Sequence, residues 1–130
     1  MAKQLLRIDL DTSFPLFGIS CHMKDFRFAW TINKFLSVDF KKSRPYIIRN
    51  DLEFSQYEHT QDTDTIYLFA NKSHNGFLIT KMKQVDYWIL FHNTVDEKTV
   101  SHYISTIRKI QSVLTVFEEN NKQIKEHFVF

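Results

Sequence analysis

Asp86 is the residue whose type and position could most directly do chemistry in this 130-residue chain. It enters an apolar run at 85–91, where an unpaired carboxylate would destabilise the fold, so it must find hydrogen-bond donors. One interpretation is a general base in a buried site. The other, which we favour, is a structural partner for a strand-end N–H group or for Arg27. Asp25 and Arg27 are expected to make a similar link near a helix start, where the charge of Asp25 suits the helix dipole.

The adjacent residues Cys21 and His22 are a second candidate for catalysis, because an imidazole can activate a thiol nucleophile. Side chains of neighbouring residues diverge in a strand or turn, so we interpret this pair as part of a loop that enters a helix. The chain has six histidines, and none has the spacing of a metal-binding helix. A set such as His22, Asp25 and His59 would have to be assembled by folding. We therefore expect no metal, no cofactor and no catalytic centre.

Basic residues in turns, together with aromatic residues in strands, are a third candidate. The basic positions are Lys41, Lys42, Arg44, Lys72, Lys81 and Lys83. Tyr67, Phe69 and Tyr87 could stack on RNA bases if one face of the sheet were open. The net charge is only +2, and the signature of RNA-recognition domains is absent. Gly18 and Gly76 stand alone, so there is no glycine-rich phosphate loop, which argues against nucleotide-dependent enzymes. RNA binding is therefore the alternative function.

The hydrophobic pattern predicts the elements that would position these residues. Strands are expected at 4–10, 51–57, 65–70, 76–79, 85–91 and 113–117. The stretch 71–76 is interpreted as a turn, with a hairpin signal at Asn75-Gly76. The run at 85–91 is apolar on both faces, which is typical of a central strand covered on both sides. The stretch at 14–19 contains Pro15 and Gly18 and is interpreted as a loop or a short edge strand. A helix with apolar positions from 100 to 110 is expected to begin at a capping box formed by Thr94 and Glu97.

A first helix is predicted over 24–37, and its apolar arc is wider than the stripe of a surface helix. The arc comprises Phe28, Ala29, Ile32, Phe35 and Leu36, extended by Phe26 and Trp30. This helix is either covered on two sides or part of a subunit interface. Asn33 falls within the arc and is expected to hydrogen-bond locally, because an unpaired buried amide costs roughly 1–3 kcal/mol.

These elements predict an α+β fold for a single domain spanning 1–130. The sheet is expected to be mainly antiparallel, with two helices on one face in a ferredoxin-like or related arrangement. The other face of the central strand must be covered by a dimer partner or by an extra segment such as the C-terminus, with Phe128 and Phe130. The apolar content of 43% is typical of a globular protein. We find no signal peptide and no run of about 20 apolar residues, so we expect a cytoplasmic protein that does not enter a membrane.

Two stretches resemble a known family. Ile79 to Tyr87 has the spacing of a family motif that ends in Val85-Asp86-Tyr87, with Thr80 and Lys81 in place of its Pro and Glu. The second stretch comprises Leu16-Phe17-Gly18-Ile19, then Asp25-Phe26-Arg27-Phe28-Ala29-Trp30, and Asn33. Over most of its length, the chain thus resembles the bacterial IPExxxVDY family. The resemblance implies an α+β architecture, a bacterial cytoplasmic setting and motif residues at Asp25, Arg27, Trp30, Asn33, Val85, Asp86 and Tyr87. It implies no catalytic residue.

The main functional prediction is a non-enzymatic association domain that acts as a homodimer, with a further protein partner left open. It depends on the two-sided apolar strand, the wide apolar arc of the first helix and the lack of a catalytic constellation. The first alternative is an RNA-binding module. The second is a small enzyme built around Asp86 or the Cys21-His22 pair.

Overall fold

A six-stranded antiparallel sheet is the centre of the computed structural model, which describes residues 12–49 and 52–128. In the order β10-β1-β9-β6-β5-β2, its strands are β10 (Val113–Glu118), β1 (Leu16–Cys21), β9 (Tyr87–Phe91), β6 (Asp64–Ala70), β5 (Gln56–Gln61) and β2 (Lys41–Lys42). Two further strand pairs are β3 (Tyr46–Arg49) with β4 (Leu52–Phe54), and β7 (Lys72–Ser73) with β8 (Gly76–Phe77). The helices are α2 (Asp25–Leu36), α3 (Glu97–Arg108), α4 (Lys122–Lys125) and a 3-10 turn, η1 (Glu126–Phe128). The strand expected at 4–10 lies outside the described residues.

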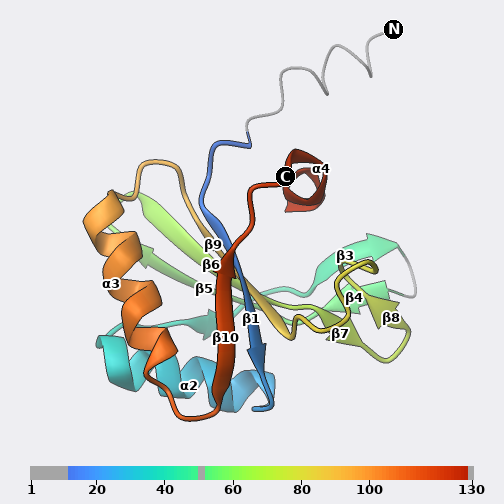
Figure 1. The fold of residues 1–130 in the computed structure, drawn as a ribbon, viewed down its shortest axis with the longest axis horizontal. Coiled ribbons are helices and arrows are strands. Elements are labelled where there is room, and N and C mark those ends of the chain that lie inside the picture. Colours follow the sequence, from blue (N-terminus) through green and yellow to red (C-terminus); the bar gives the residue numbers. More distant parts are fainter. Residues whose placement is uncertain (1–11, 50–51, 129–130) are drawn as a thin grey trace, which may run out of the picture.

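The connections confirm the predicted α+β class (Figure 1). Strand β9 separates β1 from β6, and β1 separates β9 from β10. Helix α2 follows β1 on the way to β6, and α3 joins β9 to β10, so each long helix connects strands that flank a third. This double split βαβ arrangement is ferredoxin-like. Strands β5 and β2 extend the sheet beyond β6.

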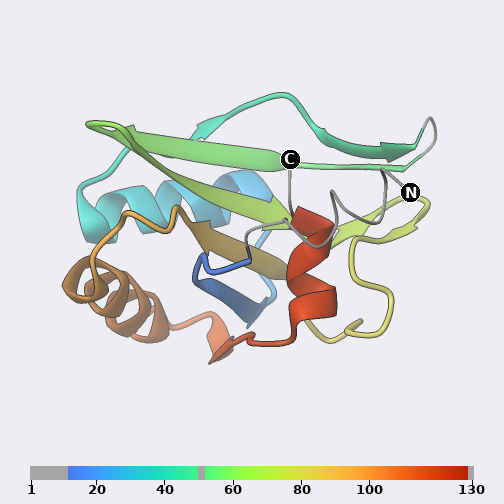
Figure 2. The ribbon, with the colours of Figure 1, turned by 90° about the horizontal axis from the view of Figure 1, so that it is seen from above.

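Both long helices cover the same face of the sheet, as predicted. Phe28 and Ile32 of α2 join Ile104 and Ile107 of α3 in one core cluster, packed against strand residues that include Ile89. In Figure 1, α2 and α3 lie on one side of the sheet, with α4 and the two strand pairs on the other. Seen from above, the long helices occupy one end of the molecule and the strand pairs the opposite end (Figure 2).

The chain itself covers the second face of the sheet. Trp88 and Leu90 of β9 point into a separate core cluster with Phe54 from β4, Leu78 from the β8–β9 connection and Phe128 from η1. All five residues of β9 are buried. The central strand predicted at 85–91 is therefore confirmed, and an extra chain segment provides its cover. Phe130 lies outside the described residues.

Strand β1 corrects the prediction of a loop or edge strand at 14–19, because it lies between β10 and β9. Pro15 directly precedes the strand and contributes only its carbonyl, which accepts a hydrogen bond of 3.0 Å from the N–H of Phe91. Gly18 sits where a Cβ would lie 2.5 Å from Cζ of Phe117 and 3.0 Å from Cζ3 of Trp88. Glycine is therefore required by close packing of two rings over the strand, and it does not mark a loop.

Two local signals were also read wrongly. Helix α3 is capped by Asp96, whose carboxylate accepts a hydrogen bond of 2.8 Å from the N–H of Thr99. Thr94 is instead bound to side chains outside the helix, so it forms no capping box. The strand expected at 76–79 ends at Phe77, because the N–H groups of the next two residues bind Asn71.

Candidate functional site

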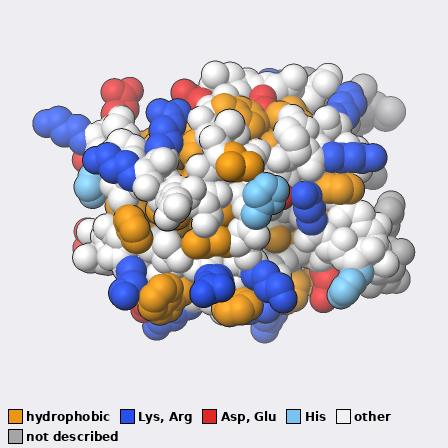
Figure 3. All heavy atoms as spheres, turned by 60° about the horizontal axis from the view of Figure 1, so that its bottom comes forward, with side chains coloured by type: hydrophobic (Ala, Val, Ile, Leu, Met, Phe, Trp, Pro, Cys, Tyr) orange, Lys and Arg blue, Asp and Glu red, His pale blue; other side chains and the backbone are white. Residues whose placement is uncertain are grey.

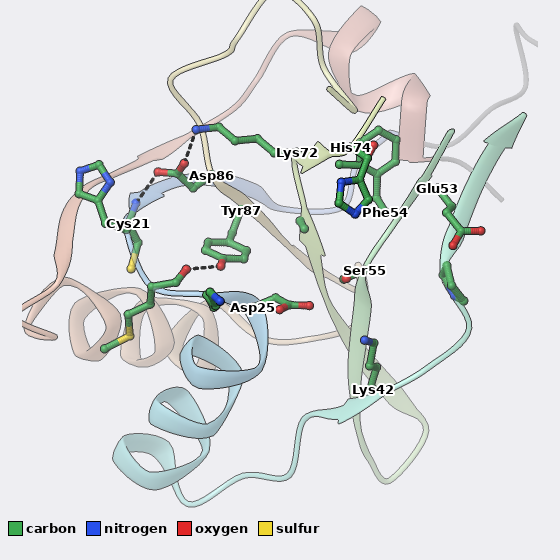
Figure 4. Close-up of a pocket in the computed structure, with 16 residues that line it drawn as sticks. Cys21, Asp25, Lys42, Glu53, Phe54, Ser55, Lys72, His74, Asp86 and Tyr87 are labelled. Atoms are coloured by element: carbon green, nitrogen blue, oxygen red, sulfur yellow. Dashed lines mark hydrogen bonds and ion pairs between the residues drawn. The ribbon is translucent and has the colours of Figure 1, made fainter. Parts of the chain in front are cut away.

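Asp86 joins the end of β1 to β7. Its Oδ2 accepts a hydrogen bond of 2.7 Å from the backbone N–H of Cys21, and its Oδ1 lies 2.8 Å from Nζ of Lys72 (Figure 4). Cys21 is the last residue of β1, so the predicted partner at a strand end is confirmed. The cationic partner is Lys72 and not Arg27. Both carboxylate oxygens thus hold structural contacts.

Tyr87 holds the segment that leads into α2. Its hydroxyl donates a hydrogen bond to the backbone carbonyl of Met23 (Figure 4). The centre of its ring lies 4.7 Å from that of the Phe28 ring. Burial raises the pKa of Tyr87, and the negative charge of Asp25 raises it further. A phenol with such a raised pKa stays protonated at neutral pH, so it serves as a hydrogen-bond donor.

Asp25 is the first residue of α2, where it places negative charge at the positive end of the helix dipole, as expected. Its Oδ2 accepts a hydrogen bond of 3.2 Å from the hydroxyl of Tyr57 on β5. Burial, followed by the charge of Asp25, raises the pKa of Tyr57 to about 12. The structural link predicted for Asp25 therefore exists, but it is made to Tyr57 and not to Arg27.

A hollow of about 700 Å³ opens between these residues. Its charged walls mix both signs, with Asp25, Glu53 and Asp86 among Lys24, Lys42 and Lys72 (Figure 4). Cys21 and His22 also line it, but the Cys21 thiol is buried. Burial raises its pKa, and the charge of Asp86 adds to this. A buried thiol with a raised pKa is not an activated nucleophile.

Val85 belongs to a buried network centred on Asn71, which sequence reasoning missed because it assigned 71–76 to a turn. The Asn71 amide donates hydrogen bonds of 2.8 Å to the carbonyl of Val85 and of 3.0 Å to that of Met82. Its Oδ1 accepts two hydrogen bonds of 2.9 Å each, from the N–H of Ile79 and from the indole N–H of Trp88. Asn71 is fully buried, so this network fixes the β8–β9 connection to the sheet. No residue spacing in the sequence indicates these contacts.

The outer side of α2 is exposed in the part of the chain that the structure describes. Phe26 is 64% exposed and Trp30 is 58% exposed, whereas the buried residues of the helix face the sheet. Arg27 and Lys34 lie beside them, and Nζ of Lys34 is 4.6 Å from the centre of the Trp30 ring. Phe26, Arg27, Trp30 and Lys34 fall within an arc of about 100° on the helix surface, which we call the α2 face. Along the lower edge of Figure 3, over α2, hydrophobic and basic side chains alternate.

Two other residues of α2 have defined places. Phe35 is 56% exposed but lies on another side of the helix, outside the α2 face. Asn33 makes the expected local hydrogen bonds. Its Oδ1 accepts a hydrogen bond of 2.7 Å from the N–H of Phe40, and its Nδ2 donates one of 3.2 Å to the Phe40 carbonyl. Asn33 therefore fixes the chain after α2.

A second hollow, of about 640 Å³, adjoins the first turn of α2. It is lined by His22, Met23, Lys24, Phe26, Arg27 and Ser112. Three of these side chains are basic types, and none is a carboxylate. The hollow continues the α2 face towards the start of the helix.

The sheet aromatics proposed for RNA stacking do not form an open platform. Phe69 and Tyr87 are buried in the two separate core clusters, on opposite faces of the sheet. Tyr67 is partly buried and packs against the cluster that contains Phe69. The premise of an open sheet face was therefore wrong.

The basic residues proposed for RNA binding are divided among several sites. Lys41 pairs with Asp39 at 3.4 Å, and Lys42 lines the 700 Å³ hollow. Arg44 lines a separate hollow next to Tyr67. The last two, Lys81 and Lys83, lie in the connection between β8 and β9.

No model of a known protein family matches the chain, and no curated protein matches it. Within residues 12–49 and 52–128, no three His, Cys, Asp or Glu side chains form a group that could hold a metal ion. In that same part of the chain, none of the helices is long and apolar enough to cross a membrane.

Proposed function

We propose that this protein is a binding domain without catalytic activity and that it associates with another protein through the α2 face. The observation that carries the proposal is the exposure of two large aromatic side chains, Phe26 and Trp30, on successive turns of one helix. Tryptophan, other aromatic residues and arginine are enriched at the energetic centres of protein interfaces. The α2 face combines Trp30, Arg27 and Phe26 in one small area.

The contacts around the larger hollow support a non-enzymatic role. Asp86, Tyr87 and Asp25 each hold a structural partner, and the Cys21 thiol is buried. Of the motif residues suggested by the resemblance to the IPExxxVDY family, Asp25, Asp86 and Tyr87 thus serve to fix the start of β9 and the start of α2. The bacterial cytoplasmic setting implied by that resemblance is part of the proposal.

The α2 face favours a different protein as partner over a second copy of this chain. A homodimer was predicted for two reasons. The first was the second apolar face of β9, but the chain itself covers that face with residues such as Phe128. The second was the wide apolar arc of α2, part of which is exposed. A two-fold interface brings the same patch of both copies together. It would therefore place Arg27 and Lys34 against cations of the same kind.

The proposal is tested by panning a library of displayed random peptides on the full chain. Peptides selected by the native protein are expected to lose binding to a Trp30→Ala or Phe26→Ala variant. Phe35→Ala is the matched control, because it removes an equally exposed aromatic ring from the same helix outside the α2 face. Circular dichroism confirms that each variant is folded. A selection that yields no binder, or binders indifferent to Trp30→Ala, would contradict the proposal.

A further inference from the structure

We infer that the partner of the α2 face is an acidic, amphipathic protein segment, whose carboxylates alternate with apolar side chains. This inference rests on the proposed function and adds the chemistry of the partner to it. The first observation is the sign of the charges around Phe26 and Trp30. Arg27 and Lys34 are cationic, and Lys24 stands at the N-cap. The one acidic residue of α2, Asp25, is turned to Tyr57 instead.

Among the residues that the structure describes, these cations have no carboxylate partner. Neither Lys24 nor Arg27 makes an ion pair there, and the ammonium group of Lys34 lies over the Trp30 ring instead. Two lysines elsewhere in the described part of the chain do have carboxylate partners, Lys41 with Asp39 and Lys72 with Asp86. A partner that covers the α2 face without carboxylates would desolvate unpaired cations, which is costly. Charge complementarity therefore selects an acidic partner.

The hollow beside the first turn gives one such carboxylate a place. His22, Lys24 and Arg27 line it, together with Phe26 and the apolar side chain of Met23. A carboxylate held there would be near three basic side chains, and the carbon atoms next to it would lie against an apolar wall. This combination matches a short acidic side chain carried on an apolar segment.

The spacing of the cations also fits an amphipathic segment. Arg27 and Lys34 are two helical turns apart, or about 10 Å along the axis, with Trp30 between them. A partner helix with carboxylates two turns apart would meet both cations, and its apolar residues between them would pack on the Trp30 ring. Single-stranded RNA also carries negative charge, but Lys34 already covers part of the Trp30 ring on which a base would stack.

The test uses the peptides selected in the library experiment. Those that need Trp30 are expected to be rich in Asp, Glu and apolar residues. Their affinity for the full chain, measured by fluorescence anisotropy of the labelled peptide, should fall at least ten-fold in the double variant Arg27→Glu, Lys34→Glu. A version of each peptide with Lys in place of its carboxylates should gain affinity for that same variant. The matched control is the double variant Lys81→Glu, Lys83→Glu, which changes the net charge equally but away from α2 and should leave binding within two-fold.

The outcomes separate the inference from the proposed function. If the selected peptides need Trp30 but are neutral or basic, or if both double variants weaken binding equally, the acidic partner is wrong and association through α2 stands. If no selected peptide needs Trp30, the proposed function itself fails. A labelled twelve-nucleotide poly-U strand, or vesicles of phosphatidylserine and phosphatidylcholine, should not compete with the peptides. Tighter, Trp30-dependent binding of either would overturn the inference in favour of a nucleic acid or a lipid surface.

Discussion

Replacing Asn71 by alanine is expected to destabilise the domain severely, because three buried groups lose their hydrogen-bond partner at once. These groups are the carbonyl of Val85, the N–H of Ile79 and the indole N–H of Trp88. The carbonyl of Met82 also loses its bond to Asn71 but still accepts one from the N–H of Val85. A buried polar group without a partner costs about 1–3 kcal/mol. At the lower end of that range, Asn71→Ala lowers the free energy of unfolding by about 3 kcal/mol. Small domains are stable by only about 5–15 kcal/mol, so much of the free energy of unfolding would be lost.

Asn71→Asp separates hydrogen bonding from side-chain volume, because the two side chains have nearly the same shape. The new carboxyl group keeps the acceptor for Ile79 and Trp88 but faces the carbonyls of Met82 and Val85 without a donor. Burial and these carbonyls disfavour its charged form, so its pKa in the folded state lies above its value in the unfolded chain. Stability is then highest below the unfolded-state pKa and is lost as pH rises through the folded-state pKa. The free energy of unfolding that this variant loses relative to the native protein should therefore be larger at pH 7.5 than at pH 4.5.

Urea unfolding followed by circular dichroism measures both variants at both pH values. Asn120→Ala is the matched control, since Asn120 is exposed and its replacement should change the free energy of unfolding by less than about 0.5 kcal/mol. The reasoning is refuted if Asn71→Ala costs less than about 1 kcal/mol. It is equally refuted if the difference between Asn71→Asp and the native protein is independent of pH.

Three further predictions concern groups in the core. The hydroxyl of Tyr103 is buried and has no hydrogen-bond partner in the described part of the chain. Urea unfolding should therefore show that Tyr103→Phe leaves the free energy of unfolding unchanged or raises it by about 1 kcal/mol, whereas a clear loss would show that the hydroxyl has a partner. Gly18→Ala should lower the free energy of unfolding by about 1–3 kcal/mol, because the new Cβ meets the Phe117 ring. A second change, Phe117→Leu, should recover part of that loss in urea unfolding, and strictly additive effects of the two changes would contradict direct contact. Burial raises the pKa of the Cys21 thiol, so labelling by a disulfide reagent at pH 7.5 should be slow in the native protein and should speed up in denaturant, whereas equal rates would show an accessible thiolate.

Strong periodicity and composition predicted the parts of the fold that depend on them. The apolar run at 85–91 has no polar side, and it became a central strand with both faces covered. Residues at helical spacing, such as Ile104 and Ile107, became the buried side of α3. The wide arc of α2 is not covered on two sides, because Phe26 and Trp30 are exposed, and its place in an interface stays a prediction.

The features that escaped prediction depend on contacts distant in the sequence. Gly18 looked like a loop signal, but it makes room for Phe117 and Trp88, which no local pattern reveals. Asn71 looked like a turn residue, yet its side chain binds groups up to 17 positions away. Thr94 had the spacing of a helix cap, but its hydroxyl binds Asp64, 30 positions away, and Asp96 caps α3 instead.

The central place of β1 has a consequence for how the chain folds during synthesis. Phe17 pairs with Ile89 on one side and with Glu118 on the other, so both neighbours of this early strand come from the last third of the sequence. Such distant pairings fold slowly, and transiently exposed apolar strands are prone to aggregate. Until β9 has been synthesised, β1 has neither of its neighbouring strands to pair with. A nascent chain that stops before Val113 would leave one edge of β1 open, which makes it a natural target for chaperones and for quality-control proteases.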